Sequence, residues 1–337
     1  MKISDSTRRA KITTFIAQKH SRQEFEPVVG RLIDRAHVDP LHLKNNACAL
    51  AHRQLLNEVI AMSKLTNEIN SFSQVPKQSP FNRYITAMRT CGLSRLAKKV
   101  TKWFDDTKAN GKSFEYRFTG KDSRLFLLHF MSLISVTECL ANAGRETTIL
   151  HVIAYICLCL RDCVSLFSRL DISDDQVSEL KTLCTNYFRA NAIFFYVNPT
   201  VWTIGHIVPA HTLHMKETYG FGLGLNSMEG REAKHVFISK YSNNTMFHSR
   251  WEQIFLHEFV SLVWLRGKGY NCSNVNSSNL SYIPKQVYSD PAFCYCGLPK
   301  ESSTDEKCRL CSNSLRTTIE SSVKKGKNLL SRVLGSQ

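Results

Sequence analysis

Two long apolar segments, close together in the chain, constrain the fold most strongly. The segment "SRLFLLHFMSLISVTECL" begins at Ser123, and "TTILHVIAYICLCL" begins at Thr147. Both place apolar residues on nearly every side of a helix, and a helix of that kind is stable only when other elements cover it. The sequence therefore predicts two buried helices that pack against each other.

Signals in the flanking sequence extend this helical prediction. Residues 39–62 carry leucine, valine and isoleucine near helical spacing, and Pro40 suits the first turn of a helix. Ser173 and Gln176 form a capping box in front of another helical segment. We therefore expect residues 1–190 to be mainly helical.

The character of the sequence changes after this region. The apolar segment "AIFFYV", residues 192–197, is short enough to form a strand. The segment "YGFGLGL", residues 219–225, holds three glycines, which suit a strand or strand-like turn whose backbone approaches another part of the protein closely. We therefore predict a small strand-containing segment here.

The chain is strongly basic. Lysine and arginine total 44 against 28 acidic residues, a formal net charge of +16, and 43% hydrophobic content excludes a disordered tail. The commonest partner of such a charge is nucleic acid, and the alternative is a basic protein that is merely soluble. The basic residues expected to contact DNA are Lys234, His235, Lys324, Lys325 and Lys327.

No segment has the pattern of a membrane span or signal peptide. The longest apolar run, Ile149 to Leu160, is shorter than the roughly 20 residues that cross a bilayer. The N-terminus is basic but lacks the apolar core of a signal peptide. We therefore expect an intracellular protein with no membrane partner, and the expected DNA partner places it in the nucleus.

Four cysteines near the C-terminus have metal-ligand spacing. In "CYCGLPKESSTDEKCRLC" a Cys294-x-Cys296 pair is followed, after eleven residues, by Cys308-x2-Cys311. Two close pairs on short turns can surround one ion and stabilise a segment too small for a core of its own. The spacing predicts a structural zinc ion, and the alternatives are four free thiols or a redox pair.

Histidines form a second cluster in "GHIVPAHTLH". On an unbroken helix His206 and His211 point well apart, but a bend at Pro209 would let both meet one ion. They are therefore candidates for a second, incomplete zinc site. The alternative is that they cap helices or pack against neighbours.

Two glutamates follow the glycine-rich segment in "SMEGREAKH". A helix that begins after Asn226 or Ser227 carries Glu229 and Glu232 in its first turn, on the same face as His235. Acidic residues in a first turn are favoured by the helix dipole whether or not they do chemistry. Both explanations remain open at this point.

These elements together resemble the C-terminal part of the V(D)J recombination-activating family, which includes RAG-like and Transib-type transposases. The resemblance is carried by "LHLKNNACALAHRQLLNEVI", the pair His206 and His211, the glycine-bearing segment and "SMEGREAKH". In that family a two-histidine element precedes a helix with an E-G-x-E core, whose second glutamate is a metal-binding catalytic carboxylate. The resemblance gives that role to Glu232, with Glu229 in support.

The resemblance also implies what this chain lacks. Family members cut DNA with two Mg²⁺ or Mn²⁺ ions held by three carboxylates. Their two catalytic aspartates lie on an RNase H-like sheet upstream of the final glutamate, and the CxxC half of the histidine zinc site is missing here. We therefore expect a homodimer, an upstream catalytic region or a partner subunit to complete the site, with Asp39 the first internal candidate.

The expected fold is mainly α: a helical domain, a small strand-containing segment leading to a catalytic-type helix, and a C-terminal zinc-ribbon-like module. The expected regions are a helical insertion-like domain at 1–190, the two-histidine element and Glu232 helix at 191–266, a linker at 267–290, and the four-cysteine zinc module with its basic amphipathic tail at 291–337.

Three functions agree with this organisation. The first is a truncated or degenerate transposase or recombinase fragment that binds DNA. The second is a domesticated, non-catalytic DNA-binding or scaffold protein that contains zinc. The third is an unrelated zinc-binding interaction module. The sequence leaves open whether the chain is an enzyme.

Overall fold

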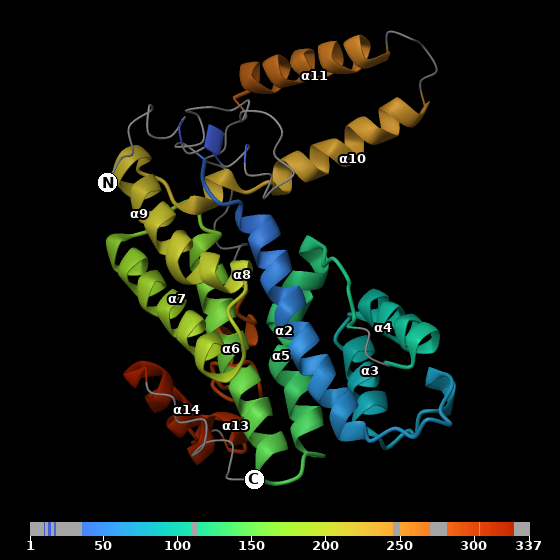
Figure 1. Cartoon of the computed structure of the whole chain (residues 1–337). Coiled ribbons are helices and arrows are strands. Elements are labelled where there is room, and N and C mark those ends of the chain that lie inside the picture. The colour runs from blue at the N-terminus through green and yellow to red at the C-terminus, as the bar shows by residue number, and fades with distance from the viewer. Residues whose placement is uncertain are drawn as a thin grey trace. The chain divides into compact units, whose positions relative to one another are not determined.

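The computed structural model describes residues 36–109, 113–244, 250–269, 282–302 and 304–326, together with Ala10, Thr13, Thr14 and Ala17. The chain divides into two compact units, Met1–His37 and Val38–Gln337. The helices discussed below belong to the second unit (Figure 1).

The described part of the second unit is built of helices joined by short connections. In chain order these elements are α2 (Pro40–Ser63), η2 (Phe72–Gln74), α3 (Pro80–Thr90), α4 (Ser94–Thr107), α5 (Gly120–Glu138), α6 (Arg145–Phe167), α7 (Asp174–Phe194), α8 (Pro199–Trp202), η3 (Thr203–Ile207), α9 (Val208–Tyr219), η4 (Leu223–Asn226), α10 (Glu229–Asn244), α11 (Arg250–Gly267), α12 (Gln286–Ser289), α13 (Arg309–Ser312) and α14 (Ser314–Lys325).

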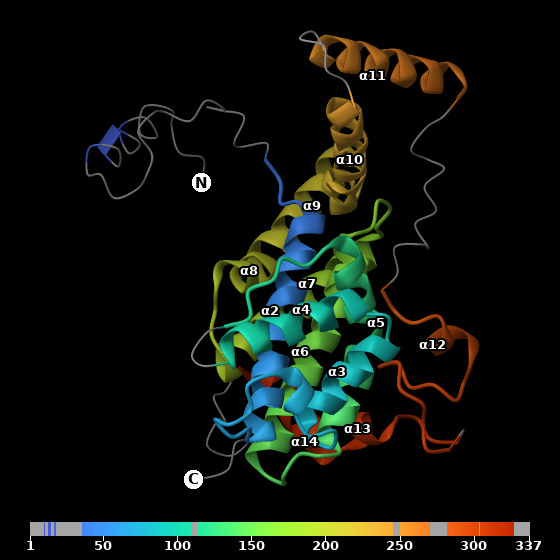
Figure 2. The same ribbon diagram turned by 90° about the vertical axis from the view of Figure 1, so that its right-hand side faces the viewer.

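The two apolar segments form adjacent helices in the core, as the sequence predicts. They are α5 and α6, and α6 also packs against α2, α7 and α14 (Figures 1 and 2). Every residue of α6 from Thr148 to Cys157 is buried. By length and composition α6 is the one described helix that passes as a membrane span, but 78% of its apolar window is buried inside the protein. Packing between helices therefore accounts for its apolar surface.

The predicted helix starts are present. Asp39 caps α2 by accepting hydrogen bonds from the backbone N–H groups of Leu41 and His42, and Pro40 occupies the first turn. Ser173 and Gln176 form the predicted capping box of α7. These local signals are readable from sequence because each cap satisfies backbone donors only a few residues away.

The predicted strand segment is wrong, because the described residues contain no strand, only an isolated bridge between Phe293 and Pro299. The first candidate, 192–197, continues α7 to Phe194, since the buried helix face that includes Asn191 extends that far. In the second candidate, 219–225, α9 ends and η4 begins.

A π-helical turn replaces the expected bend at Pro209. Asn198 caps α8, as its position before Pro199 predicts, and the chain passes through η3 directly into α9. Pro209 lies in the first turn of α9, just after this π turn, in which the Val208 N–H donates to the Thr203 carbonyl. The expected interruption at Pro209 is therefore wrong.

The C-terminal segment packs on the helical core. Ile319 and Val323 of α14 are fully buried, and α14 lies against α6 and α7 (Figure 1). Tyr282, expected within the linker at 267–290, is buried as well, and residues 270–281 of that linker lie outside the described residues. The unit boundary after His37 coincides with none of the expected region boundaries.

Helix α11 differs from the others because its apolar residues are exposed. Among them Phe255, Phe259 and Trp264 are each about 60% exposed, and of the α11 side chains that the structure describes only Ile254 is buried. A helix that exposes this much apolar surface is typical of an element with a binding partner.

Candidate functional site

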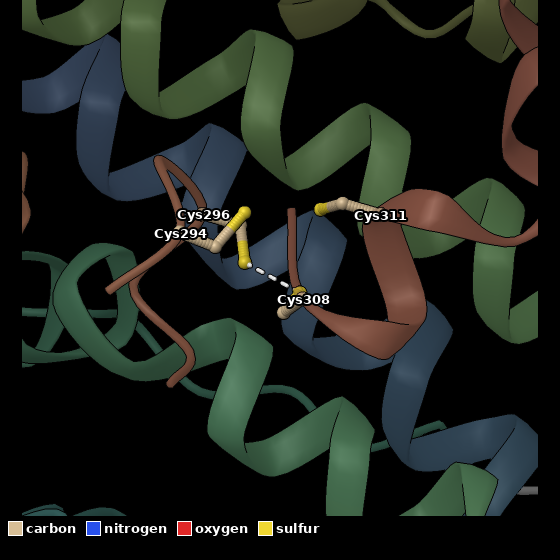
Figure 3. A group of neighbouring side chains, drawn as sticks. All are labelled: Cys294, Cys296, Cys308 and Cys311. Atoms are coloured by element: carbon tan, nitrogen blue, oxygen red, sulfur yellow. Dashed lines mark hydrogen bonds between the residues drawn. The ribbon is translucent and has the colours of Figure 1, made fainter. Parts of the chain in front are cut away.

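The four C-terminal cysteines come together. The Sγ atoms of Cys294, Cys296, Cys308 and Cys311 all lie within 4.8 Å of one another (Figure 3). The side chains of the first three are buried. Sγ of Cys296 and Sγ of Cys308 are 3.4 Å apart, well beyond the roughly 2.05 Å of a disulfide bond. The cluster could hold a metal ion.

Short turns bring each pair of cysteines into position. The backbone N–H of Cys294 donates to the Leu298 carbonyl over 2.9 Å, and Gly297 closes this turn with φ of 99°, a region that favours glycine. Cys308 caps α13, and Cys311 lies one turn further along. The second pair is thus helical, and the module has one isolated bridge where a ribbon has strands.

The thiols of the cluster perturb one another's pKa values. Hydrogen bonds with Cys296, Cys308 and Cys311 lower the pKa of Cys294. Hydrogen bonds with Cys294, Cys308 and Cys311 raise the pKa of Cys296. Coordination requires thiolates, so a metal ion bound among these sulfurs would replace the protons between them.

A buried arginine ties this module to the core. Arg161 of α6 is 0% exposed; its Nη1 donates to the Tyr295 carbonyl over 3.0 Å and its Nε donates to Asp162 over 3.0 Å. The guanidinium also lies 4.6 Å from the centre of the Tyr295 ring. Sequence reasoning missed this residue, although a lone arginine at the end of a long apolar run was the available signal.

A second cluster lies where α2 meets α10. Both oxygens of Asp39 accept hydrogen bonds, one from the backbone N–H of Leu41 and of Met228, the other from the backbone N–H and Nδ1 of His42. Burial acts to raise the pKa of Asp39, but these hydrogen bonds outweigh it and lower the pKa below its ordinary value. Asp39 is thus an ionised cap whose oxygens are already in use.

The predicted acidic face of α10 is turned toward α2. Oε1 of Glu229 accepts a hydrogen bond from Nζ of Lys44 over 2.8 Å, and Oε1 of Glu232 lies 3.6 Å from Nε2 of His42. Asp39, the first internal candidate for a missing carboxylate, is therefore linked to Glu232 through the imidazole of His42.

These groups border a pocket of about 470 Å³. Its lining residues are Leu41, Lys44, Gly120, Lys121, Arg124, Glu229, Glu232 and Tyr282. Three cationic side chains face two carboxylates, and one of those carboxylates is paired with Lys44. Two divalent ions need several free oxygen ligands that converge, so this lining is a poor match for a two-ion centre.

The histidine pair does not form a second metal centre with the described residues. His206 lies against the rings of Phe188 and Trp202, whereas Nδ1 of His211 accepts a hydrogen bond from the backbone N–H of Val38. Within the described ranges, the four cysteines are the only group of three or more potential ligands whose atoms converge.

The glycine-rich segment approaches the backbone of residues 168–170 closely, and this approach packs the segment against the loop after α6. The N–H groups of Gly222 and Gly224 donate to the carbonyls of Leu170 and Arg169 in the loop after α6. A Cβ on Gly224 would lie 2.4 Å from the carbonyl oxygen of Ser168. The glycines thus fix the path into α10 against this loop.

The residues expected to contact DNA have different surroundings. Lys234 forms an ion pair with Glu258 of α11, while His235, Lys324 and Lys325 are exposed. Lys327 lies outside the described residues.

Comparisons with protein-family models, with curated proteins and with solved structures found no match for this chain. Its function is therefore argued from its own residues and geometry.

Proposed function

We propose that this chain is a DNA-binding protein of the RAG-like transposase type, braced by a structural zinc ion and unable to cut DNA without carboxylates from another segment or subunit. The DNA-binding part of this proposal rests on the distribution of charge. Residues 77–108, which include α3 and α4, hold eight lysines and arginines and two aspartates, a net charge of +6 out of +16. Positive charge concentrated in this way is typical of proteins that bind phosphate backbones.

Zinc is the metal that we assign to the cysteine cluster. Four thiolates in a closed, mostly buried site are typical of structural zinc, and soft sulfur ligands disfavour Mg²⁺ and Ca²⁺. The proposed role of the ion is to hold residues 294–311 on the core, where Arg161 and Glu138 already anchor the segment through Tyr295 and Arg309.

The absence of cleavage by the chain alone follows from the state of the acidic residues. Asp39 is occupied as a cap, Glu229 is paired with Lys44, and Glu232 is left as the carboxylate available to a metal ion. One glutamate cannot hold two divalent ions about 4 Å apart. In this proposal Glu232 contributes to a Mg²⁺ or Mn²⁺ site only when other carboxylates complete it.

A gel-shift titration with duplex DNA tests the binding proposal. We expect retardation at low salt that weakens steeply at moderate salt, because each neutralised phosphate releases a counterion. Failure to bind at low salt, or binding that is independent of salt, contradicts the proposal.

A nicking assay tests the second part. The purified chain is incubated with plasmid and with terminal-repeat DNA in Mg²⁺ or Mn²⁺, and we expect no cleavage. The variant Glu232→Gln is expected to bind DNA like the wild type. Cleavage that Glu232→Gln abolishes would mean that this chain completes a catalytic site, with Asp39 the first residue to examine.

A scaffold role, without DNA chemistry, is the second candidate, and the exposed apolar residues of α11 favour it. In this case a second copy of the chain covers α11. Sedimentation analysis of the wild type beside Phe259→Glu tests it: a dimer that the substitution dissociates supports the role, and a monomeric wild type argues against it.

A further inference from the structure

A groove runs along the surface where α3 packs on α5, and its lining residues come from three parts of the chain. Its volume is about 920 Å³, toward the upper end of the roughly 300–1,000 Å³ that is usual for ligand sites. The loop before α3 contributes Lys77, α3 contributes Arg83 and Arg89, and α5 contributes Ser132 and Ser135.

The charged side chains that line this groove are all positive. Lys77, Arg83 and Arg89 are all exposed, and no aspartate or glutamate is among its lining residues. None of the three forms an ion pair with a carboxylate in the described part of the chain. The nearest acids in sequence are Glu68, nine residues before Lys77, and Asp105 and Asp106 at the end of α4, and Asp105 accepts a hydrogen bond from the backbone N–H of Phe72.

The amphipathic pattern of α3 creates this arrangement. One face of the helix buries Phe81, Tyr84, Ile85 and Met88 in the core. Arg83, Thr86 and Thr90, three or four residues apart, share a face that borders the groove. The arginines are therefore held by a packed helix rather than by a loop.

Neighbouring groups position the cationic side chains without neutralising them. Nη2 of Arg83 donates to the amide oxygen of Gln78 over 2.6 Å, and the guanidinium of Arg89 lies 5.9 Å from the centre of the Phe72 ring. Ser132 and Ser135 add two hydroxyls from α5, and neither hydroxyl makes a hydrogen bond within the described ranges. The groove thus offers guanidinium, ammonium and hydroxyl donors to a single ligand.

We propose that this groove binds the phosphodiester backbone of DNA, and that it, not the C-terminal tail, is the principal DNA contact. Guanidinium groups and hydroxyls are the usual donors to phosphate oxygens. The C-terminal segment has a lower density of charge, because residues 282–337 carry nine lysines and arginines and five acids, a net charge of +4 over 56 residues, against +6 over the 32 residues of 77–108. This inference rests on the proposed DNA-binding function and names the surface responsible.

The first test compares two triple variants with equal loss of charge. The groove variant is Lys77→Gln, Arg83→Gln and Arg89→Gln. The control variant is Lys181→Gln, Lys285→Gln and Lys307→Gln, at exposed positions outside the groove. Affinity for a duplex is measured by fluorescence anisotropy over a range of salt concentrations, with thermal unfolding as a check on folding.

We expect the groove variant to bind at least about tenfold more weakly than the control. We also expect the slope of log affinity against log salt to fall by about 2.7 for the groove variant, because each lost phosphate contact removes about 0.9. Equal losses in the two variants would overturn the groove assignment while leaving DNA binding intact. A wild type that does not bind at low salt would instead overturn the proposed function.

A second measurement uses the wild-type protein and so does not depend on how the variants fold. Exposed lysines are acetylated with and without duplex DNA and quantified by mass spectrometry. DNA is expected to protect Lys77 and to leave Lys181 and Lys285 reactive. If Lys77 stays fully reactive while Lys324 and Lys325 become protected, the tail is the contact and the inference fails.

Discussion

Nζ of Lys44 lies 2.8 Å from Oε1 of Glu229, and this ion pair joins α2 to the first turn of α10. The Lys44 side chain is 3% exposed, and its other partner is the hydroxyl of Tyr282, also at 2.8 Å. Burial, the largest influence, acts to lower the pKa of Lys44, but Tyr282 and Glu229 together raise the pKa above its ordinary value. The ammonium therefore stays charged in a place with little solvent.

Removing Glu229, the acidic partner of Lys44, should destabilise the protein more than removing Glu232. Glu229→Leu leaves the buried ammonium with Tyr282 alone, and we expect the free energy of unfolding to fall by about 1–3 kcal/mol. Glu232→Leu is the matched control, because Glu232 is as exposed as Glu229 but lies 3.6 Å from His42 instead of against a buried ammonium. Urea unfolding measures both, and equal losses would show that the pair contributes nothing specific.

Asp39 should make stability depend on acid pH. Its folded-state pKa is below the ordinary 3.8, so its contribution is present above that value and is lost as pH falls through the folded-state pKa. Asparagine keeps a capping oxygen but removes the charge, so we expect Asp39→Asn to cost about 1 kcal/mol near neutral pH through weaker hydrogen bonds from His42 and Met228. The melting temperatures of variant and wild type should converge below about pH 4. A difference that stays constant down to pH 3 would rule out this role.

Loss of the metal should loosen the C-terminal module. We expect one zinc ion per chain, and we expect Cys308→Ser or a strong chelator to lower the melting temperature and to expose residues 294–311 to protease. Cys139→Ser is the control, because Cys139 is exposed and outside the cluster. Native mass spectrometry of a metal-free chain with an unchanged melting temperature would contradict the assignment.

Arg161 should stabilise the same C-terminal module through its contacts with Tyr295. Arg161→Leu removes the Nε donor from Asp162 and the Nη1 donor from the Tyr295 carbonyl, and we expect a loss of roughly 2–4 kcal/mol with faster removal of zinc by a chelator. Arg189→Gln is a useful comparison, because among the described residues exposed Arg189 donates only to the Lys324 carbonyl, over 3.2 Å. Zinc release at the wild-type rate in Arg161→Leu would show that Arg161 does not help to retain the metal ion.

Gly224 should tolerate no side chain. In Gly224→Ala the new Cβ would meet the carbonyl oxygens of Ser168 and Arg169 at 2.4 and 2.6 Å, so we expect a loss of about 1–3 kcal/mol. Gly220→Ala isolates backbone strain, since Gly220 has φ of 76° with no atom within 4 Å of the added carbon. Its expected cost is about 1 kcal/mol. Thermal unfolding that ranks Gly220→Ala as the more damaging change would argue against close packing at Gly224.

The sequence by itself determined the features that depend on neighbours within a few residues. The apolar pattern of α5 and α6, the helix start at Pro40, the capping box at Ser173 and the start of α10 near Glu229 are local, because helix periodicity and orphan backbone donors involve residues only three or four apart. The spacing of the four cysteines also predicted their cluster, since each pair lies on one short turn.

Only the tertiary structure decided what each segment packs against. The glycines at 222 and 224 suggested a strand, but the loop after α6 supplies their hydrogen-bond partners, more than fifty residues away. Asp39 and Glu232 are 193 residues apart in the chain, and His42 stands between them only because α2 packs beside the start of α10. The groove of Lys77, Arg83 and Arg89 likewise exists because α3 packs on α5. Long-range packing of this kind depends on the whole core, which no local pattern of residues specifies.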